Sequence, residues 1–244
     1  MLVAAAVCPC PPLLVPEVAA GAAPELAAAR AACADALGVL AAARPDRLVV
    51  VGPLESEGSR TYPSGARGTF CGFGVPVDVC LGADTGAGAR AEGAGAGAEL
   101  PYGLAVGAWL LQRTQWAVAP VEGLGVGDGL TAERCAALGR GLTEDAGRVA
   151  MLVLGDASAC RTLKAPGYLD ERAAPFDAEI GRALGAADLT ALHALDAELA
   201  RELKVSGRAP WQTLAGAADG AGLGGTLLYE DAPYGVGYVV AAWS

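Results

Sequence analysis

Three polar segments of this 244-residue sequence contain the side chains that could do chemistry. Each segment follows a stretch that is typical of a buried strand, and ligands of open α/β sheets bind beyond the carboxyl ends of the strands. We therefore expect the three segments to meet at one edge of a sheet. The candidates are Cys8 and Cys10 after the first strand, Glu55 and Glu57 after the second, and Asp156, Cys160, Arg161 and Lys164 after a later one.

Cys10 is the first candidate nucleophile. If Arg161 or Lys164 lies close to its thiol, the positive charge lowers the thiol pKa and favours the reactive thiolate. The alternative, which we favour, is a small buried side chain beside the prolines that follow, because cysteine is often a core residue. Cys8 and Cys10 do not form a zinc motif, since no second pair of cysteines or histidines stands at ligand spacing.

The other titratable residues have both a catalytic and a structural interpretation. Glu55 and Glu57 could act as acid and base, but acidic loop residues are usually solvated. We interpret Glu230 and Asp231 as residues of a hairpin turn. His193, the only histidine, lies beside a helical stripe of leucines and is interpreted as a boundary residue. One histidine excludes any mechanism that needs two within the chain.

The segment 157–177 is longer than an ordinary connection, which favours a functional loop. Asp156 and Lys164 could position a polar substrate there, with Tyr168 and Asp170 in the same loop. The alternative is a loop held by its own ion pairs. The candidates for substrate binding are Glu55, Glu57, Arg161 and Tyr168.

Apolar strands alternate with amphipathic helices along the chain, which predicts a three-layer α/β fold with a mostly parallel central sheet and a C-terminal antiparallel hairpin. We expect one domain over residues 1–244. The Gly/Ala-rich segment 82–99 has nothing large to bury and is expected to be a flexible surface loop. The expected strands are 2–7, 47–51, 75–81, 116–121, 149–154, 226–230 and 235–242, and the expected helices are 24–43, 102–112, 131–145, 189–203 and 210–218.

The composition limits the partners. The formal net charge is -10 and the basic residues are scattered, which argues against a nucleic acid or an anionic membrane surface. No window approaches about 18 uninterrupted apolar residues, so no membrane span is expected. The start lacks a positively charged leader. The seven cysteines do not suggest a disulfide framework in a chain with a large core, which favours reduced thiols in the cytoplasm.

Several blocks of the sequence resemble the class III extradiol ring-cleavage dioxygenase subunit-B-like (LigB-like) family, in its alanine-rich actinobacterial branch. The blocks are PCPPLLVPE, VVVGP, GDASACRTLKAPGYLDERAAPFD, GRAPWQTLAGA and LLYEDAPYGVGYVVA, and they span nearly the whole chain. The resemblance implies the fold of that family. It also implies a non-haem Fe(II) site of two histidines and a glutamate, which cleaves catechol-type rings with molecular oxygen.

At the positions of the family's ligands this chain has other residues. The resemblance places Cys10 where the first histidine stands, the segment GPLESEG where the second stands, and Gly207 where the glutamate stands. The family's catalytic histidine falls near Cys160. His193 alone cannot supply the two imidazoles of the iron site, although a fold can be inherited without its site.

We therefore expect a dioxygenase-like protein that has lost Fe(II) ring cleavage and binds a small molecule or a partner at the strand ends, without a cofactor. The alternative is an active enzyme, either an iron-dependent dioxygenase with a Cys/carboxylate shell or a metal-free enzyme that uses Cys10 and Lys164. A third hypothesis is a structural subunit of an assembly such as a homo-oligomer. The catalytic residues stay open, with Cys10, Asp156, Cys160 and Lys164 as candidates.

Overall fold

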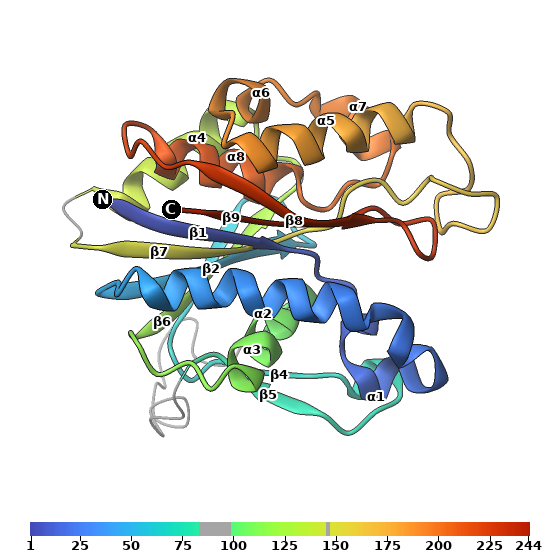
Figure 1. The fold of residues 1–244 in the computed structure, drawn as a ribbon, viewed down its shortest axis with the longest axis horizontal. Helices are drawn as coiled ribbons and strands as arrows, with labels where there is room; N and C mark the ends of the chain where they lie inside the picture. The colour runs from blue at the N-terminus through green and yellow to red at the C-terminus, as the bar shows by residue number, and fades with distance from the viewer. Residues whose placement is uncertain (83–98, 145–146) are drawn as a thin grey trace.

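A seven-stranded sheet forms the centre of the protein in the computed structural model, which describes residues 1–82, 99–144 and 147–244 (Figure 1). Its strands are β1 (Leu2–Cys8), β2 (Arg47–Leu54), β3 (Ser59–Tyr62), β6 (Val121–Gly127), β7 (Val149–Leu154), β8 (Gly225–Asp231) and β9 (Tyr238–Trp243). They lie in the order β3-β6-β2-β7-β1-β9-β8. Strands β6, β2, β7 and β1 are parallel to one another, whereas β3, β9 and β8 pair in antiparallel fashion.

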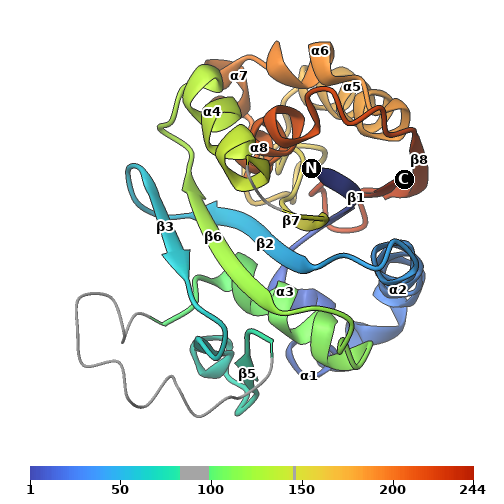
Figure 2. The ribbon, with the colours of Figure 1, turned by 90° about the vertical axis from the view of Figure 1, so that its left-hand side faces the viewer.

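Helices cover both faces of this sheet (Figure 2). One face carries α1 (Pro16–Ala19), α2 (Ala27–Ala42) and α3 (Tyr102–Arg113), and the other carries α4 (Ala132–Thr143), α5 (Ala173–Ala186), α6 (Leu189–His193), α7 (Ala197–Glu202) and α8 (Arg208–Ala218). A separate two-stranded sheet of β4 (Arg67–Thr69) and β5 (Asp78–Cys80) lies beside α3. Short 3-10 helices span Pro12–Leu14, Ala20–Leu26 and Cys71–Phe73. In the part of the chain that the structure describes, no helix is long and apolar enough to cross a bilayer.

Strand β7 shows why the sheet is buried on both sides. All of its residues are inaccessible to solvent, and an uninterrupted apolar run suits a strand covered by helices on both faces. Its side chains alternate between two hydrophobic clusters, with Ala150, Leu152 and Leu154 toward α2 and α3, and Val149, Met151 and Val153 toward α5 and α8.

The mixed α/β class, the mostly parallel sheet and the antiparallel C-terminal strands are confirmed. The strand predicted at 149–154 has the same bounds as β7. The strand predicted at 75–81 is shorter, since only Asp78–Cys80 pairs, and it does so with β4 outside the central sheet. Of the flexible loop predicted at 82–99, residues 83–98 lie outside the described residues.

The strand predicted at 116–121 is wrong, because β6, which lies between β3 and β2, begins at Val121 and continues through a glycine-rich stretch. Before it, the Trp116 indole N–H donates to the Ala119 carbonyl oxygen at 3.0 Å, which closes a turn. The glycines of β6 are required by packing. A Cβ on Gly123 would lie 2.8 Å from Leu81 Cδ2, too close for two carbon atoms.

Three helical predictions also need correction. The loop predicted over 157–177 ends earlier, because α5 begins at Ala173. The leucine stripe predicted over 189–203 belongs to two short helices, α6 and α7, whose N-caps are Asp188 and Asp196. Each aspartate accepts backbone N–H groups of the helix that follows it, and such a cap starts a new helix. The last helix, α8, begins at Arg208 rather than at Pro210.

Candidate functional site

The carboxyl ends of β2, β7 and β1 lie side by side because these parallel strands are neighbours. Residues after β1 and β7 are joined at this edge. The Cys10 backbone N–H donates to Asp156 Oδ1 at 2.8 Å, and the Gly155 N–H donates to the Cys8 carbonyl oxygen at 3.1 Å. The structure therefore brings together two of the candidates, Cys10 and Asp156, which are 146 positions apart in the chain.

The segment before α8 supports Asp156 from the other side. The Asp156 N–H donates to Ser206 Oγ at 2.9 Å, and its carbonyl oxygen accepts the Gly207 N–H at 3.0 Å. Gly207 has no room for a side chain, because a Cβ there would overlap the indole ring of Trp211. Since Trp211 is fully buried, its ring fixes the Gly207 backbone and, through it, Asp156.

Two tyrosines complete the group. Tyr102 is the first residue of α3, and Tyr238 is the first residue of β9. Burial raises the pKa of both phenols, and the nearby Asp156 and Cys10 raise it further, so both hydroxyls stay protonated. We call Cys10, Tyr102, Asp156, Ser206 and Tyr238 the strand-end cluster.

Three members of the strand-end cluster, Tyr102, Asp156 and Ser206, keep part of their surface accessible, whereas Cys10 and Tyr238 are buried. Asp156 is the only carboxylate of the cluster. Burial raises the pKa of its carboxyl to about 7, and the Cys10 N–H, which stabilises the ionised form, opposes this shift. A carboxyl with that pKa changes its protonation state near neutral pH.

The Cys10 thiol does not have the properties of an activated nucleophile. Burial and the neighbouring Asp156 raise its pKa well above the ordinary value, and the Ser206 hydroxyl opposes this only in part. No contact joins it to Lys164 in the described part of the chain, where Lys164 is exposed. The thiol is thus protonated at neutral pH, which fits the interpretation of Cys10 as a buried residue beside the prolines.

The remaining candidates after β1 and β2 are Cys8, Glu55 and Glu57, and none of them belongs to the strand-end cluster. Cys8 ends β1 and is fully buried; its pKa is raised, first by Cys33 and then by burial. Glu55 is exposed but close enough to Tyr102 to raise its pKa slightly. Glu57 is exposed and makes no contact with the cluster that the described residues show.

The candidates in the loop after β7 lie away from the cluster. The Cys160 thiol donates to the Leu203 carbonyl oxygen at 3.5 Å. Arg161 pairs with Asp177 of α5, with Nη1 3.1 Å from Oδ2. Tyr168 is exposed, with 63% of its surface accessible. Asp170 pairs with Arg172, so the loop contains an ion pair of its own.

The residues at the strand ends do not fit the iron site that the family resemblance implies. The strand-end cluster offers one carboxylate, one protonated thiol and hydroxyl groups, but no imidazole. His193 ends α6 and faces Asp219, with Nε2 3.8 Å from Oδ1. Asp219 follows the C-terminal end of α8, about 16 Å from its start at a rise of 1.5 Å per residue. Among the described residues, no three His, Cys, Asp or Glu side chains are arranged to hold a metal ion.

Three members of the strand-end cluster, Tyr102, Ser206 and Tyr238, are not among the site residues predicted from the sequence. A signal for two of them exists. Helices that connect parallel strands begin at the edge where the strands end, so residues at the starts of predicted helices belong to the same search. Tyr102 and Ser206 stand at or just before such starts. Tyr238 enters from an antiparallel strand, and no local pattern places its ring there.

The fold and this edge define a mixed α/β protein with polar side chains at the carboxyl ends of its parallel strands. No family model and no curated protein matches the sequence. Among solved structures, the chain is similar to the crystal structure of uncharacterized protein JW3007 from Escherichia coli K12, with a TM-score of 0.58 and 15% sequence identity. The alignment covers 99% of each chain. At this identity the likeness shows the fold alone.

Proposed function

We propose that this protein binds a small, hydroxyl-bearing ring compound at the strand-end cluster, and that it is a relative of the extradiol dioxygenases without their iron-dependent ring cleavage. The observation that carries this proposal is the partly accessible Asp156 residue at the sheet edge where ligands of α/β folds bind. Its carboxyl accepts the Cys10 N–H, and its backbone N–H donates to Ser206 Oγ. The free thiols of Cys8, Cys10 and Cys33 support a reducing compartment such as the cytoplasm.

The chemistry of the cluster suits such a ligand. A carboxylate accepts hydrogen bonds only, so it favours ligand groups that donate, such as hydroxyls. The protonated Tyr102 phenol, which is partly accessible, both donates and accepts, and it can bind a second polar group of the same ligand. The surrounding buried surface lowers the local polarity, and this strengthens each of these hydrogen bonds.

The loss of iron chemistry rests on the donor set. A facial site for Fe(II) needs two imidazoles and a carboxylate, and the strand-end cluster contains only the carboxylate of Asp156. The Cys10 thiol is protonated, whereas a metal-bound cysteine is a thiolate. No step of ring cleavage is therefore assigned to these residues.

The test is a calorimetric titration of metal-free protein with catechol, which presents two adjacent hydroxyl donors. We expect measurable binding to the wild-type protein and at least a tenfold loss in Asp156→Asn. The matched control is Asp35→Asn, an exposed aspartate on α2, which should bind as the wild type does. Equal affinity for Asp156→Asn, or no binding of catechol, contradicts the proposal.

A second assay tests the loss of chemistry separately. Protein loaded with ferrous ion is mixed with catechol in air, and the absorbance of a ring-opened product is followed. No product is expected. Turnover that depends on added iron would show that the chain assembles an active iron site from other donors.

Proton-transfer catalysis is a second candidate function, favoured by one observation. The Asp156 carboxyl has a pKa raised to about 7, and a general base works best when its pKa is near the working pH. The test is incubation of bound catechol in deuterium oxide, with mass spectrometry of the recovered compound. Incorporation of deuterium at ring carbon in the wild type but not in Asp156→Asn supports catalysis; equal incorporation excludes it.

A further inference from the structure

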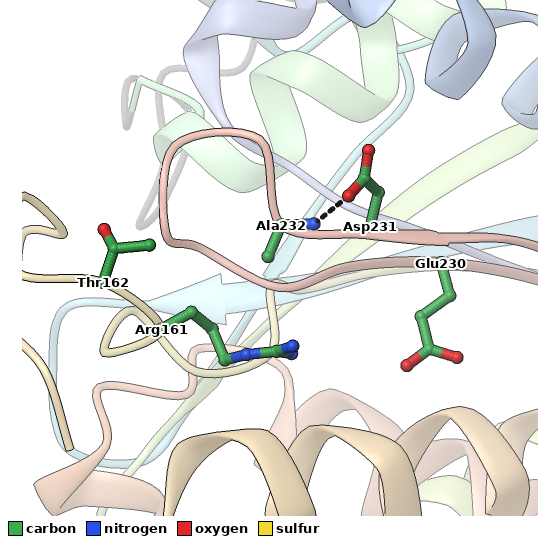
Figure 3. Close-up of a pocket in the computed structure, with 5 residues that line it drawn as sticks. All are labelled: Arg161, Thr162, Glu230, Asp231 and Ala232. Carbon is green, nitrogen blue, oxygen red and sulfur yellow. Dashed lines mark hydrogen bonds between the residues drawn. The ribbon is translucent and has the colours of Figure 1, made fainter. Parts of the chain in front are cut away.

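A second polar site lies between the loop after β7 and the end of β8. It is a pocket of about 400 Å³ lined by Arg161, Thr162, Glu230, Asp231 and Ala232 (Figure 3). None of these residues belongs to the strand-end cluster. The pocket is formed by two segments, the loop after β7 and the end of strand β8, that are held together by the hydrogen bond from the Arg161 N–H to the Gly235 carbonyl oxygen at 3.0 Å.

The positive charge of this pocket belongs to Arg161, whose guanidinium is held in place by Asp177. Arg161 Nη1 donates to Asp177 Oδ2 at 3.1 Å. Asp177 is buried in α5, and its carboxylate also accepts the backbone N–H and the hydroxyl of Ser158, each at 2.8 Å. Two hydrogen bonds from Ser158 thus hold the carboxylate that positions the guanidinium.

Arg161 has donors left for a ligand. Its Nε and Nη2 have no hydrogen-bond partner within residues 1–82, 99–144 and 147–244, and 31% of its side chain is accessible. An arginine with one edge bound to a protein carboxylate and the other edge open can bind a carboxylate of a ligand with two hydrogen bonds.

The negative charge of the pocket comes from Glu230. Its side chain leaves β8 toward α5, where a Cβ on Gly181 would lie 2.8 Å from Glu230 Oε2. Because Gly181 has no side chain, the Glu230 carboxylate can pack directly against α5. In Figure 3 the Asp231 carboxylate points to the other side of the hairpin, as expected for the next residue of a strand.

Arg161 and Glu230 face the same space without neutralising each other. In Figure 3 the guanidinium and the Glu230 carboxylate both lie between the hairpin and α5, yet the described residues show no ion pair between them, and Glu230 has no other hydrogen-bond partner there. Opposite charges that share a pocket and stay apart leave room for a ligand with the complementary pair of charges.

We propose that this pocket binds a zwitterionic small molecule of the amino-acid class, with its carboxylate on Arg161 and its ammonium group on Glu230. The charges of the pocket explain why a ligand with only a carboxylate or only an ammonium group should bind more weakly than a zwitterion. A simple anion meets the repulsion of Glu230, and a simple cation leaves Nε and Nη2 of Arg161 without an acceptor, whereas a zwitterion satisfies both ends. The volume is in the range of small-molecule sites.

The test uses isothermal titration calorimetry at low salt with three ω-amino acids of increasing length, glycine, γ-aminobutyrate and ε-aminohexanoate. Acetate, butyrate, hexanoate and the matching alkylamines serve as half-ligands. We expect at least one amino acid to bind tenfold or more tightly than both of its half-ligands. The proposal is overturned if no amino acid exceeds its half-ligands, because the two charges then do not act together.

A variant separates this site from a general effect of charge. Glu230→Gln keeps the size of an exposed side chain and is expected to fold, which the melting temperature verifies. It should lose the tenfold advantage of the amino acid while keeping the weak binding of the carboxylate half-ligand. The control, Glu198→Gln, removes the same charge from exposed α7 and should bind as the wild type does. Unchanged amino-acid binding by Glu230→Gln contradicts the proposal.

The same titration distinguishes this site from the strand-end cluster. Asp156→Asn should bind the amino acid normally, because Asp156 does not line the pocket. Loss of amino-acid binding in Asp156→Asn, with normal binding in Glu230→Gln, would place the zwitterion at the strand-end cluster and overturn the assignment.

Discussion

Replacing Asp156 with asparagine should make the protein more stable at neutral pH than the wild type. Burial raises the Asp156 pKa from 3.8 to about 7 in the folded protein. Below pH 3.8 the carboxyl is protonated in both the folded and the unfolded chain, so it causes no difference. Between the two pKa values the unfolded chain ionises first, and the folded state is progressively disfavoured.

The magnitude follows from the size of the pKa difference. One pH unit corresponds to ~1.36 kcal/mol, so about three units set an upper limit of about 4 kcal/mol. The effect is reached fully above pH 7, and contact of the carboxyl with water reduces it. Asparagine keeps the oxygen that accepts the Cys10 N–H and cannot ionise, so the variant avoids the penalty.

Urea denaturation of both proteins from pH 4 to pH 8 measures this effect. The free energy of unfolding of Asp156→Asn minus that of the wild type should rise with pH, by up to about 1.4 kcal/mol per unit, and level off above pH 7. Asp35→Asn, at an exposed position, should give a flat difference. A flat difference for Asp156→Asn as well, or a rise confined to the region below pH 5, would refute the assignment of a raised pKa to Asp156.

Three further predictions concern the supports of the two sites. Gly207→Ala should destabilise the protein by about 1–3 kcal/mol in urea denaturation, because its Cβ overlaps the buried Trp211 ring; wild-type stability would contradict the close packing. Asp177→Ala should cost about 1–3 kcal/mol, since Arg161 loses its charged partner and both Ser158 groups lose their acceptor; the check is the same denaturation, and an unchanged midpoint argues against it. In native protein, iodoacetamide should label the exposed Cys71 rapidly and leave the buried Cys8, Cys10 and Cys33 unmodified until urea is added. Mass spectrometry identifies the labelled cysteines. If Cys10 is labelled first, its thiol is accessible and reactive, which contradicts this prediction.

The order of elements predicts the meeting of Cys10 and Asp156, because parallel neighbours end at one edge and the residues after them must be close. The pKa of Asp156 could not be predicted in this way. It depends on how completely Tyr102, Ser206 and Tyr238 exclude water from the carboxyl, and two of these come from helix starts and one from an antiparallel strand. Burial of this kind is a property of the packed structure.

Strand β6 shows a second limit of the sequence. Glycine is unfavourable in strands on average, so the stretch 123–129 is typical of a loop. In the folded protein the side chains of Leu81 and Tyr62 occupy the space where side chains at Gly123 would stand. Tertiary contacts thus select glycine where local propensity disfavours it. Helix α5 shows a different limit. The sequence predicts a long loop that includes the first residues of this helix, which begins at Ala173.

Strand β1 has its partners late in the chain. It lies between β7, formed by residues 149–154, and β9, formed by residues 238–243. While the ribosome is still synthesising the middle of the protein, residues 2–8 have no strand to pair with, and their apolar side chains stay unprotected. Folding of the sheet must therefore wait for distant segments, which slows it and exposes the nascent chain to aggregation. We therefore expect residues 2–8 to be a binding site for chaperones during translation.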